Sequence, residues 1–523
     1  MNLTKFNNIN LFEAGKNFFE QLKVALKTKT EQSIPAKGIL KDQFKDVPIF
    51  NSIKETFFLG LIDNSVLSDT SSIFESDGLS LDESLNKVNE QYDGIMVFAV
   101  KLENYYPTRT EIANLVRAFN KSSKKVPVIV LLSYENNGNS FLTFSTTERT
   151  KYLQNWREGE KLGKVSMLKD INIRQPHTGH LKILQDLELK PDVRTFDALY
   201  KQWREVFDIQ LLNKRFYQEI ANWFEWAVKN VKFPNDIKDD KDDEKFNNEN
   251  IIRLLTRIIF IWFLKEKNLI PEIIFNEEKL YSIVKDFGNK DANNYYKAIL
   301  QNLFFATLNR EVDKRDFATD GKFHENTEHY GIKNLFRYSS SFKIEQTEVK
   351  NIFQKVPFVN GGLFDCLDSN DEIKINENGK TKYKVLYYDG FSRNPQKQAQ
   401  VPDFLFFNSN INGKGLFNIL NGYKFTVAEN TPVEEEIALD PELLGRIFEN
   451  LLASYNEESK TTARKATGSF YTPREIVNYM VDESIMEYLQ GKLENLVGQA
   501  SLLVNKNHLN QNEQTGHLSG QSG

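Results

Sequence analysis

The segment 468–477 combines residue types whose spacing suits the binding of a polar or anionic ligand. Thr472 can cap the first turn of a helix with its side-chain oxygen, and Pro473 then falls at the first helical position, where a missing N–H costs nothing. Glu475 lies three residues after Thr472 and completes a capping box. The amides of a helix N-terminus attract anions, so a ligand could bind at this turn. A capping box alone, however, is more typical of an ordinary helix start, and on these residues alone we favour that interpretation.

Basic residues flank this turn, and a second group of them lies nearer the N-terminus. The first group consists of Lys460, Arg464, Lys465 and Arg474. The second contains few interspersed acids and consists of Arg149, Lys151, Arg157, Lys161, Lys164, Lys169 and Arg174. Since Lys and Arg contact phosphates without reading bases, both groups predict contact with double-stranded DNA, with an ordinary solvated surface as the alternative.

Five other side chains could in principle bind a metal or stack on a base, but packing explains them better. His177 and His180 have the spacing of two helical ligands, yet no Cys or third His accompanies them, so we expect them to cap or pack against a helix start. Cys366 is single and is expected to be a small buried hydrophobe. Trp223 and Trp226 have helical spacing that favours core packing over base stacking. No metal site is predicted from these residues.

The turn at 468–477 resembles the element that opens the catalytic domain of N6-adenine DNA methyltransferases of the type IIG restriction–modification class. These are class I enzymes that use S-adenosylmethionine. Four upstream blocks are also similar to those of the family: 360–364, 401–407, 440–456 and 460–465. The resemblance covers about 195–489 and implies that the aromatic-Thr-Pro loop, Phe470, Tyr471, Thr472 and Pro473, lies against S-adenosylmethionine.

Two motifs that this family needs for methyl transfer do not occur in the sequence. One is a Gly-rich turn after a buried strand, and the other is an Asn/Asp-Pro-Pro-aromatic loop that grips a flipped-out adenine. The sequence has no Pro-Pro step, and Gly413-Lys414-Gly415 is a polar turn without a preceding buried strand. We therefore expect a chain truncated before its catalytic centre, with only the opening helix of the methyltransferase domain, a disordered tail at 494–523 and a separate chain that carries the rest.

Type IIG polypeptides usually begin with a nuclease, and the first part of this chain carries part of a nuclease signature. The common core needs an Asp on one strand and Glu-x-Lys on the next, because two carboxylates hold Mg²⁺ while the Lys stabilises the attacked phosphate. Asp93, Lys101 and Glu103 match in part, and Glu13 or Glu20 could add a carboxylate, but Ala99 stands where the acid before Lys101 is needed. An active nuclease and a structural α/β module both stay open.

The elements that position these residues begin with an α/β domain at 1–190. An amphipathic helix is predicted at 12–26, buried strands at 92–100 and 126–132, and a helix between them at 110–120. The turn Asn136-Asn137-Gly138-Asn139 predicts a hairpin to a further strand at 140–145.

The rest of the chain is predicted to be a mainly α-helical region followed by an α+β segment. The helical domain covers 191–350, and an acidic loop at 236–250 interrupts it. Residues 258–264 are the most apolar run and continue the pattern of a buried helix. Residues 351–493 form an α+β connector that ends in the helices preceding the methyltransferase centre.

The composition favours a cytoplasmic protein without a membrane span. One cysteine among 523 residues excludes an internal disulfide, and the polar N-terminus lacks the apolar core of a signal peptide. The apolar run at 258–264 is far shorter than the roughly 20 residues that a membrane helix needs. Because the formal net charge is −5, DNA binding must depend on local basic surfaces.

Three functions remain open on these grounds. The one we favour is part of an adenine-specific DNA methyltransferase of a restriction–modification system, which transfers a methyl group from S-adenosylmethionine to adenine N6. The second is a DNA-binding or nuclease module that needs no methylation. The third is a scaffold subunit that docks on a separate methyltransferase through the apolar face of the helix at 474–489.

Overall fold

The structure is a computed structural model. It describes residues 1–24, 26–67, 78–91, 94–124, 126–151, 160–236, 243–289, 292–319, 332–359, 361–373, 382–409, 413–426, 430–431, 433–439, 476–477 and 479–493. The chain forms two units, Met1–Leu444 and Gly445–Gly523, and each is described by itself.

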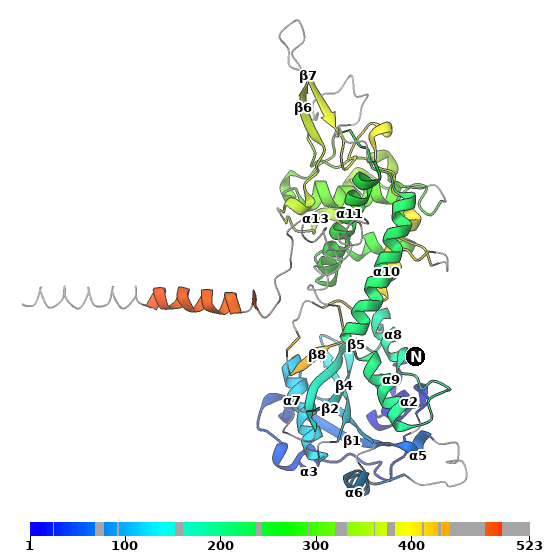
Figure 1. The fold of residues 1–523 in the computed structure, drawn as a ribbon, viewed down its shortest axis with the longest axis vertical. Coiled ribbons are helices and arrows are strands. Elements are labelled where there is room, and N and C mark those ends of the chain that lie inside the picture. The colour runs from blue at the N-terminus through cyan, green and yellow to red at the C-terminus, as the bar shows by residue number, and fades with distance from the viewer. Residues whose placement is uncertain are drawn as a thin grey trace, which may run out of the picture. The chain divides into compact units, whose positions relative to one another are not determined.

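A six-stranded mixed sheet forms the centre of the N-terminal domain (Figure 1). In spatial order its strands are β1 (Ile53–Ile62), β2 (Ile95–Leu102), β3 (Val128–Asn136), β4 (Asn139–Lys151), β5 (Glu160–Asn172) and β8 (Glu434–Glu436). β2 and β3 are parallel and are connected through α7 (Arg109–Ser122), whereas β1 and β2, β3 and β4, and β4 and β5 pair antiparallel. The mixed α/β content confirms the predicted class, while the division into four domains stays a prediction.

Helices cover both faces of this sheet, which explains why β2 and β3 are apolar on both sides. On one face, Val97 and Ala99 of β2 belong to the same core as Phe18 of α2 (Leu11–Gln21). On the other, Phe98 and Val100 belong to the core that includes the buried side of α7. The other α-helices among the described residues of 1–190 are α1 (Lys5–Asn8), α3 (Ala36–Leu40), α4 (Pro48–Asn51), α5 (Asn64–Leu67), α6 (Leu81–Gln91) and α8 (Thr178–Asp186).

The hairpin between β3 and β4 confirms the turn predicted from the sequence. Asn136 pairs with Asn139, so that Asn137 and Gly138 alone form the loop. Their φ angles are 48° and 75°. A two-residue turn of type I′ needs two such left-handed residues, because its backbone twist then matches that of the strands.

β8 is a strand that the sequence did not reveal. Its three residues pair in parallel with β5, from Val165 opposite Glu434 to Met167 opposite Glu436. Three consecutive glutamates have low strand propensity, so local sequence gives no signal for a strand here. The open edge of β5 supplies the hydrogen-bonding partner, and the segment just before residue 439 thereby becomes part of the N-terminal sheet.

Residues 196–308 are mainly helical. The helices are α9 (Phe196–Val206), α10 (Ile209–Asn230), α11 (Asp243–Glu266), α12 (Glu277–Ile283) and the wide π-helix η4 (Tyr295–Leu308). α11 contains the apolar run 258–264, as predicted. The predicted loop at 236–250 is wrong from residue 243 onward, because α11 already begins at Asp243.

The remaining part of the first unit consists of short elements. They are α13 (Gln346–Gln354), α14 (Leu416–Asn421), the hairpin of β6 (Ser369–Ile373) and β7 (Lys382–Leu386), and the short 3₁₀ turns η1 (Lys41–Gln43), η3 (Glu272–Phe275), η5 (Val312–Lys314), η6 (Ser339–Ser341), η7 (Gly362–Phe364), η8 (Pro395–Lys397) and η9 (Asp403–Leu405).

In the second unit, residues 476–477 and 479–493 are helical, which confirms the predicted helix within this range. The apolar residues that define its predicted face are all exposed: Ile476, Val477, Met480, Val481, Ile485, Tyr488 and Leu489. Among the described residues of the chain, no helix has the length and apolar character needed to cross a membrane.

Candidate functional site

The predicted cofactor loop and the basic residues around it lie outside the described residues. This holds for Phe470, Tyr471, Thr472 and Pro473 and for Lys460, Arg464, Lys465 and Arg474. Their assignment to S-adenosylmethionine and to DNA stays a prediction.

The structure places two of the three predicted nuclease residues, since Asp93 also lies outside the described range. Lys101 is near the end of β2, opposite Glu55 of β1 and Ser133 of β3. Glu103 follows β2 and its carboxylate is paired with the Lys54 ammonium, with both side chains about half exposed. An exposed carboxylate that is paired with a lysine is poorly suited to bind Mg²⁺, because the ion needs several oxygen ligands that converge on it.

The position two residues before Lys101 is filled by the core. Ala99 is fully buried and lies opposite Phe57 of β1, whose ring packs on Phe12 of α2 with centroids 5.8 Å apart. A carboxylate at position 99 would therefore be desolvated among apolar side chains. Among the described residues, no group of three or more His, Cys, Asp or Glu could hold a metal ion.

The second basic stretch is largely neutralised by partners where its side chains are described. Lys164 pairs with Glu435 of β8 at 3.2 Å. Lys169 is buried, pairs with Asp170 at 2.7 Å and lies 4.3 Å from the centre of the Tyr106 ring. Arg174 is exposed. The side chains of Arg149, Lys151, Arg157 and Lys161 lie outside the described range, so their contact with DNA stays a prediction.

Strand β8 brings two glutamates under the first turn of α7. The Arg109 Nη1 atom lies 3.9 Å from Glu436 Oε2, and both side chains are nine-tenths buried. Arg109 Nη2 donates to Asn430 Oδ1 at 2.7 Å, and the Thr110 hydroxyl donates to Glu434 Oε1 at 3.1 Å. Burial raises the pKa of the Glu436 carboxyl, and the charge of Arg109 opposes that rise. Among the described atoms, Arg109 Nε and Nη1 have no hydrogen-bond partner, so this corner is loosely paired.

His177 and His180 belong to a helix start rather than to a metal site. His177 is the N-cap of α8, and its Nδ1 atom accepts a hydrogen bond from the Gly179 amide at 3.0 Å. Burial lowers the pKa of His177 to about 4 and that of His180 to about 3, and the nearby Lys424 charge adds to both shifts. Both rings are therefore neutral at physiological pH, and the packing interpretation is confirmed.

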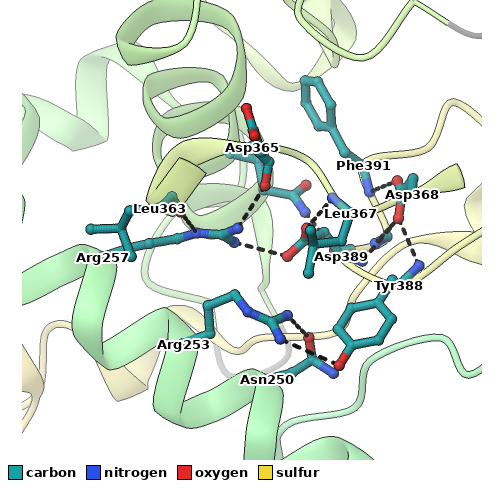
Figure 2. Close-up of polar contacts among 12 residues, drawn as sticks. Asn250, Arg253, Arg257, Leu363, Asp365, Leu367, Asp368, Tyr388, Asp389 and Phe391 are labelled. Carbon is teal, nitrogen blue, oxygen red and sulfur yellow. Dashed lines mark hydrogen bonds and ion pairs between the residues drawn. The ribbon is translucent and has the colours of Figure 1, made fainter. Parts of the chain in front are cut away.

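The described part of the block at 360–364 is fixed to α11 by a buried arginine (Figure 2). Arg257 Nη1 forms an ion pair with Asp389 Oδ1 at 2.8 Å, and both side chains are only 2% exposed. Its Nε donates to the Leu363 carbonyl at 2.8 Å, and its Nη2 donates to the Asp365 carbonyl at 2.9 Å. Because each guanidinium nitrogen already has a partner, this arginine holds a loop and offers no free group for chemistry.

A second buried carboxylate completes the same cluster (Figure 2). The Asp368 oxygens accept the backbone amides of Tyr388, Asp389, Gly390 and Phe391 at 2.7–3.1 Å. Burial raises the pKa of Asp368, and the bond from the Tyr388 amide opposes that rise. Cys366, between these anchors, is buried as predicted. We assign this cluster a structural role, since it ties 361–368 and 388–391 to one helix.

The block at 401–407 contains a different kind of buried acid. Asp403 Oδ1 accepts the Tyr295 amide at 3.0 Å, but Oδ2 has no hydrogen-bond partner among the described residues. Burial raises the pKa of Asp403 to about 7, while the Tyr295 amide and the Lys297 charge oppose the rise. Trp223 donates from Nε1 to the Leu405 carbonyl at 2.7 Å, and Trp226 packs on Phe404, so both tryptophans are packing residues as predicted.

Sequence reasoning missed a group of exposed lysines at one corner of the N-terminal domain. Lys37 and Lys41 belong to α3 and η1, Lys45 follows them, Lys121 belongs to the last turn of α7, and Lys124 follows that helix. The four-residue spacing of the first three was visible, but their proximity to α7 depends on the fold.

Comparison with known proteins gives two matches. Residues 439–521 match the N-6 DNA methylase family. The chain is also 22% identical over 366 residues to a protein of Methanocaldococcus jannaschii whose provisional name is that of a type II restriction enzyme and methyltransferase. That alignment covers 62% of this chain and 25% of the relative, so the chain spans about a quarter of the relative's length. No solved structure matches the chain.

These matches confirm the predicted relation to the N6-adenine methyltransferases of restriction–modification systems.

Proposed function

We propose, from this relation, that the chain is the N-terminal part of an adenine-specific DNA methyltransferase of type IIG restriction–modification character. The observation that carries the proposal is the family match at 439–521, which begins just after the last strand of the N-terminal sheet. The loop at 470–473 lies within the matched range and has the aromatic-Thr-Pro sequence expected next to the cofactor.

S-adenosylmethionine supplies the methyl group in this chemistry. In this chain, Phe470 and Tyr471 would contact the cofactor, and the Thr472-Pro473 step has the sequence of a helix start. Gripping the adenine amine needs a Pro-Pro loop, and the sequence holds no Pro-Pro step. We therefore propose that methyl transfer requires further polypeptide that carries this loop, either as a separate chain or as a continuation of this one.

The exposed apolar side chains at 476–489 are consistent with a requirement for further polypeptide. A contiguous exposed apolar surface is unusual for a protein that works alone. We propose that these side chains pack on the sheet of the methyltransferase domain that carries the Pro-Pro loop.

We further propose that the N-terminal α/β domain holds DNA and does not cut it. The apolar surroundings of Ala99, where the nuclease signature needs an acid, support the second part of this proposal. The alternative, a Mg²⁺-dependent nuclease that uses Asp93, Lys101 and Glu103, is tested by assaying plasmid cleavage.

The experiment that tests the proposal is calorimetric titration with S-adenosylmethionine, on the chain alone and mixed with a polypeptide that carries the Asn-Pro-Pro-aromatic loop. We expect binding only in the mixture. Thr472→Ala should weaken it about tenfold, because the loss of a helix cap costs about 1 kcal/mol or more. Thr472→Ser keeps the capping oxygen and is the matched control. Absence of binding in both the chain alone and the mixture would refute the cofactor proposal.

A further inference from the structure

Five lysines from two distant stretches of sequence meet on one surface of the N-terminal domain. We call this surface the lysine platform: Lys37, Lys41, Lys45, Lys121 and Lys124. All five side chains are exposed. α3 and η1 contact α7, and the Ser122 hydroxyl donates to the Leu40 carbonyl at 3.0 Å. This bond places Lys41 beside the end of α7, where Lys121 and Lys124 lie.

None of the five lysines forms an ion pair with a described residue. Other lysines of the same domain do: Lys23 pairs with Glu188, and Lys29 pairs with Glu83. The acids nearest in sequence are Asp42 and Asp46, and the five lysines outnumber them. The platform therefore presents an excess of positive charge in a chain whose net charge is −5.

A rigid base carries these charges. Leu40 and Phe50 are buried in the core that also holds Phe119 of α7. The ring of Phe44 meets that of Phe50 edge-on at 5.6 Å, and the Lys37 ammonium lies 5.1 Å from the Phe44 ring centre. Because the segment is held by core side chains, binding a ligand on the lysines would order little additional backbone.

The backbone at Lys41 adds an independent observation. Its φ and ψ are 46° and −122°, a combination that glycine adopts freely and that a residue with a Cβ adopts only under strain. Lys124 also has a left-handed φ, of 54°. A sequence that placed glycine at position 41 would fold with less strain, so the lysine there is not explained by the fold.

We propose that the lysine platform binds the phosphate backbone of double-stranded DNA. Lysine ammonium groups contact phosphates as point charges and read no bases, so the contact would hold the domain on DNA of any sequence. The inference rests on the proposed function and deepens it, because it names the surface through which the N-terminal domain meets the substrate.

The test measures binding of the full chain to a short duplex by fluorescence anisotropy, over a series of salt concentrations. Neutralising the platform with five Lys→Gln changes should lower the steepness of the salt dependence by about 4.5, since each phosphate contact adds about 0.9 to the log–log slope. The matched control carries Lys→Gln at five exposed lysines outside the platform, which are Lys5, Lys190, Lys229, Lys279 and Lys285. The control has the same net charge and should keep the slope of the unmodified chain.

A single change separates binding from folding. Lys41→Gly removes the charge and relieves the backbone, so the melting temperature should stay equal or rise while the salt slope falls by about 0.9. Lys41→Arg keeps the charge and should bind like the unmodified chain. If Lys41→Gly and the fivefold variant both bind as the unmodified chain does, the platform is not the DNA contact.

The outcomes also separate this inference from the proposed function. A chain that binds the cofactor when mixed with the loop-bearing polypeptide, but has no affinity for duplex DNA at low salt, would overturn the platform and leave the methyltransferase proposal intact. A chain that binds DNA through the platform but never binds the cofactor would overturn the methyltransferase proposal and leave the platform intact.

Discussion

Two buried arginine–carboxylate pairs show how differently two regions of this protein are held together. In the helical region, Arg257 and Asp389 are 2.8 Å apart and almost fully buried, and the arginine also donates to two carbonyls. Under β8, Arg109 and Glu436 are 3.9 Å apart, and two of the arginine nitrogens have no hydrogen-bond partner among the described atoms.

The difference teaches which segments are fixed and which can be displaced. A buried charge is tolerated when its hydrogen-bonding capacity is filled, as it is for Arg257. The hydrogen-bonding capacity of Arg109, under β8, is not filled by described atoms, and β8 itself has only three residues. We therefore expect the helical region to unfold as a unit, and the edge that leads to the methylase segment to open locally.

The largest effect is expected at Asp389. Asp389→Ala leaves the Arg257 charge buried without an opposite charge and should lower the free energy of unfolding by about 3–5 kcal/mol. Urea unfolding followed by circular dichroism measures the change. Asp389→Asn keeps an acceptor for the Leu367 amide and should cost less. If both variants lost the same small amount of unfolding free energy, the Arg257–Asp389 pair would be no more important for stability than the Arg109–Glu436 pair.

The carboxyl of Asp403 is buried, and no cation contacts it in the described part of the chain. Its ionisation should therefore make the free energy of unfolding depend on pH. With its pKa at about 7 in the folded protein, Asp403 keeps a proton that the unfolded chain loses near pH 4. The folded state then binds more protons between these values, so stability falls as pH rises from about 4 to 7 and levels off above it.

Asp403→Asn carries no titrating charge and should therefore gain stability relative to the unmodified chain as pH rises, by up to about 4 kcal/mol at pH 8. Unfolding curves at several pH values measure this gain. Asp313→Asn, at an exposed aspartate, is the control. Parallel stability curves for Asp403→Asn and the unmodified chain would show that Asp403 is not protonated in the folded state.

A smaller and local effect is expected under β8. Glu436→Ala should cost about 1–2 kcal/mol, because Arg109 loses its nearby charge but keeps its bond to Asn430. Amide hydrogen exchange should quicken in 433–439 and remain slow in β2 and β3. Glu436→Gln keeps the shape of the side chain as a control. Faster exchange across the whole sheet would mean that β8 does not open locally but unfolds together with the other strands.

The smallest effect is expected at the exposed pair of Lys54 and Glu103. Glu103→Ala should leave the melting temperature unchanged, because pairs between exposed side chains contribute little. Plasmid DNA incubated with Mg²⁺ or Mn²⁺ should stay uncut by both the unmodified chain and the variant. Cleavage that disappears on Glu103→Ala or Asp93→Ala would establish the nuclease and refute our proposal for this domain.

Local sequence was sufficient wherever the signal was local. The Asn137-Gly138 turn gave the β3–β4 hairpin, because few other residues adopt two left-handed conformations in succession. The helix predicted at 110–120 lies within α7, which begins with a capping box of Thr108 and Glu111. The helix at 474–489, whose described residues are helical, and the packing role of His177 were predicted on the same grounds.

Features that join distant segments could not be predicted in this way. β8 pairs with β5 only because the sheet leaves an edge open, and the lysine platform exists only because η1 packs on α7. The second basic stretch showed the reverse error, since Lys164 and Lys169 looked free in the sequence and are paired in the fold.

The sequence by itself determined the kind of protein, through the blocks that lead to Phe470–Pro473, and the helices and turns whose signals lie within a few residues. The tertiary structure decided which charges are free and which are neutralised, and which acids lie in water and which in the core. The physical reason is that hydrogen-bonding periodicity and capping act over a few neighbouring residues, whereas electrostatics and desolvation depend on what the fold brings together in space.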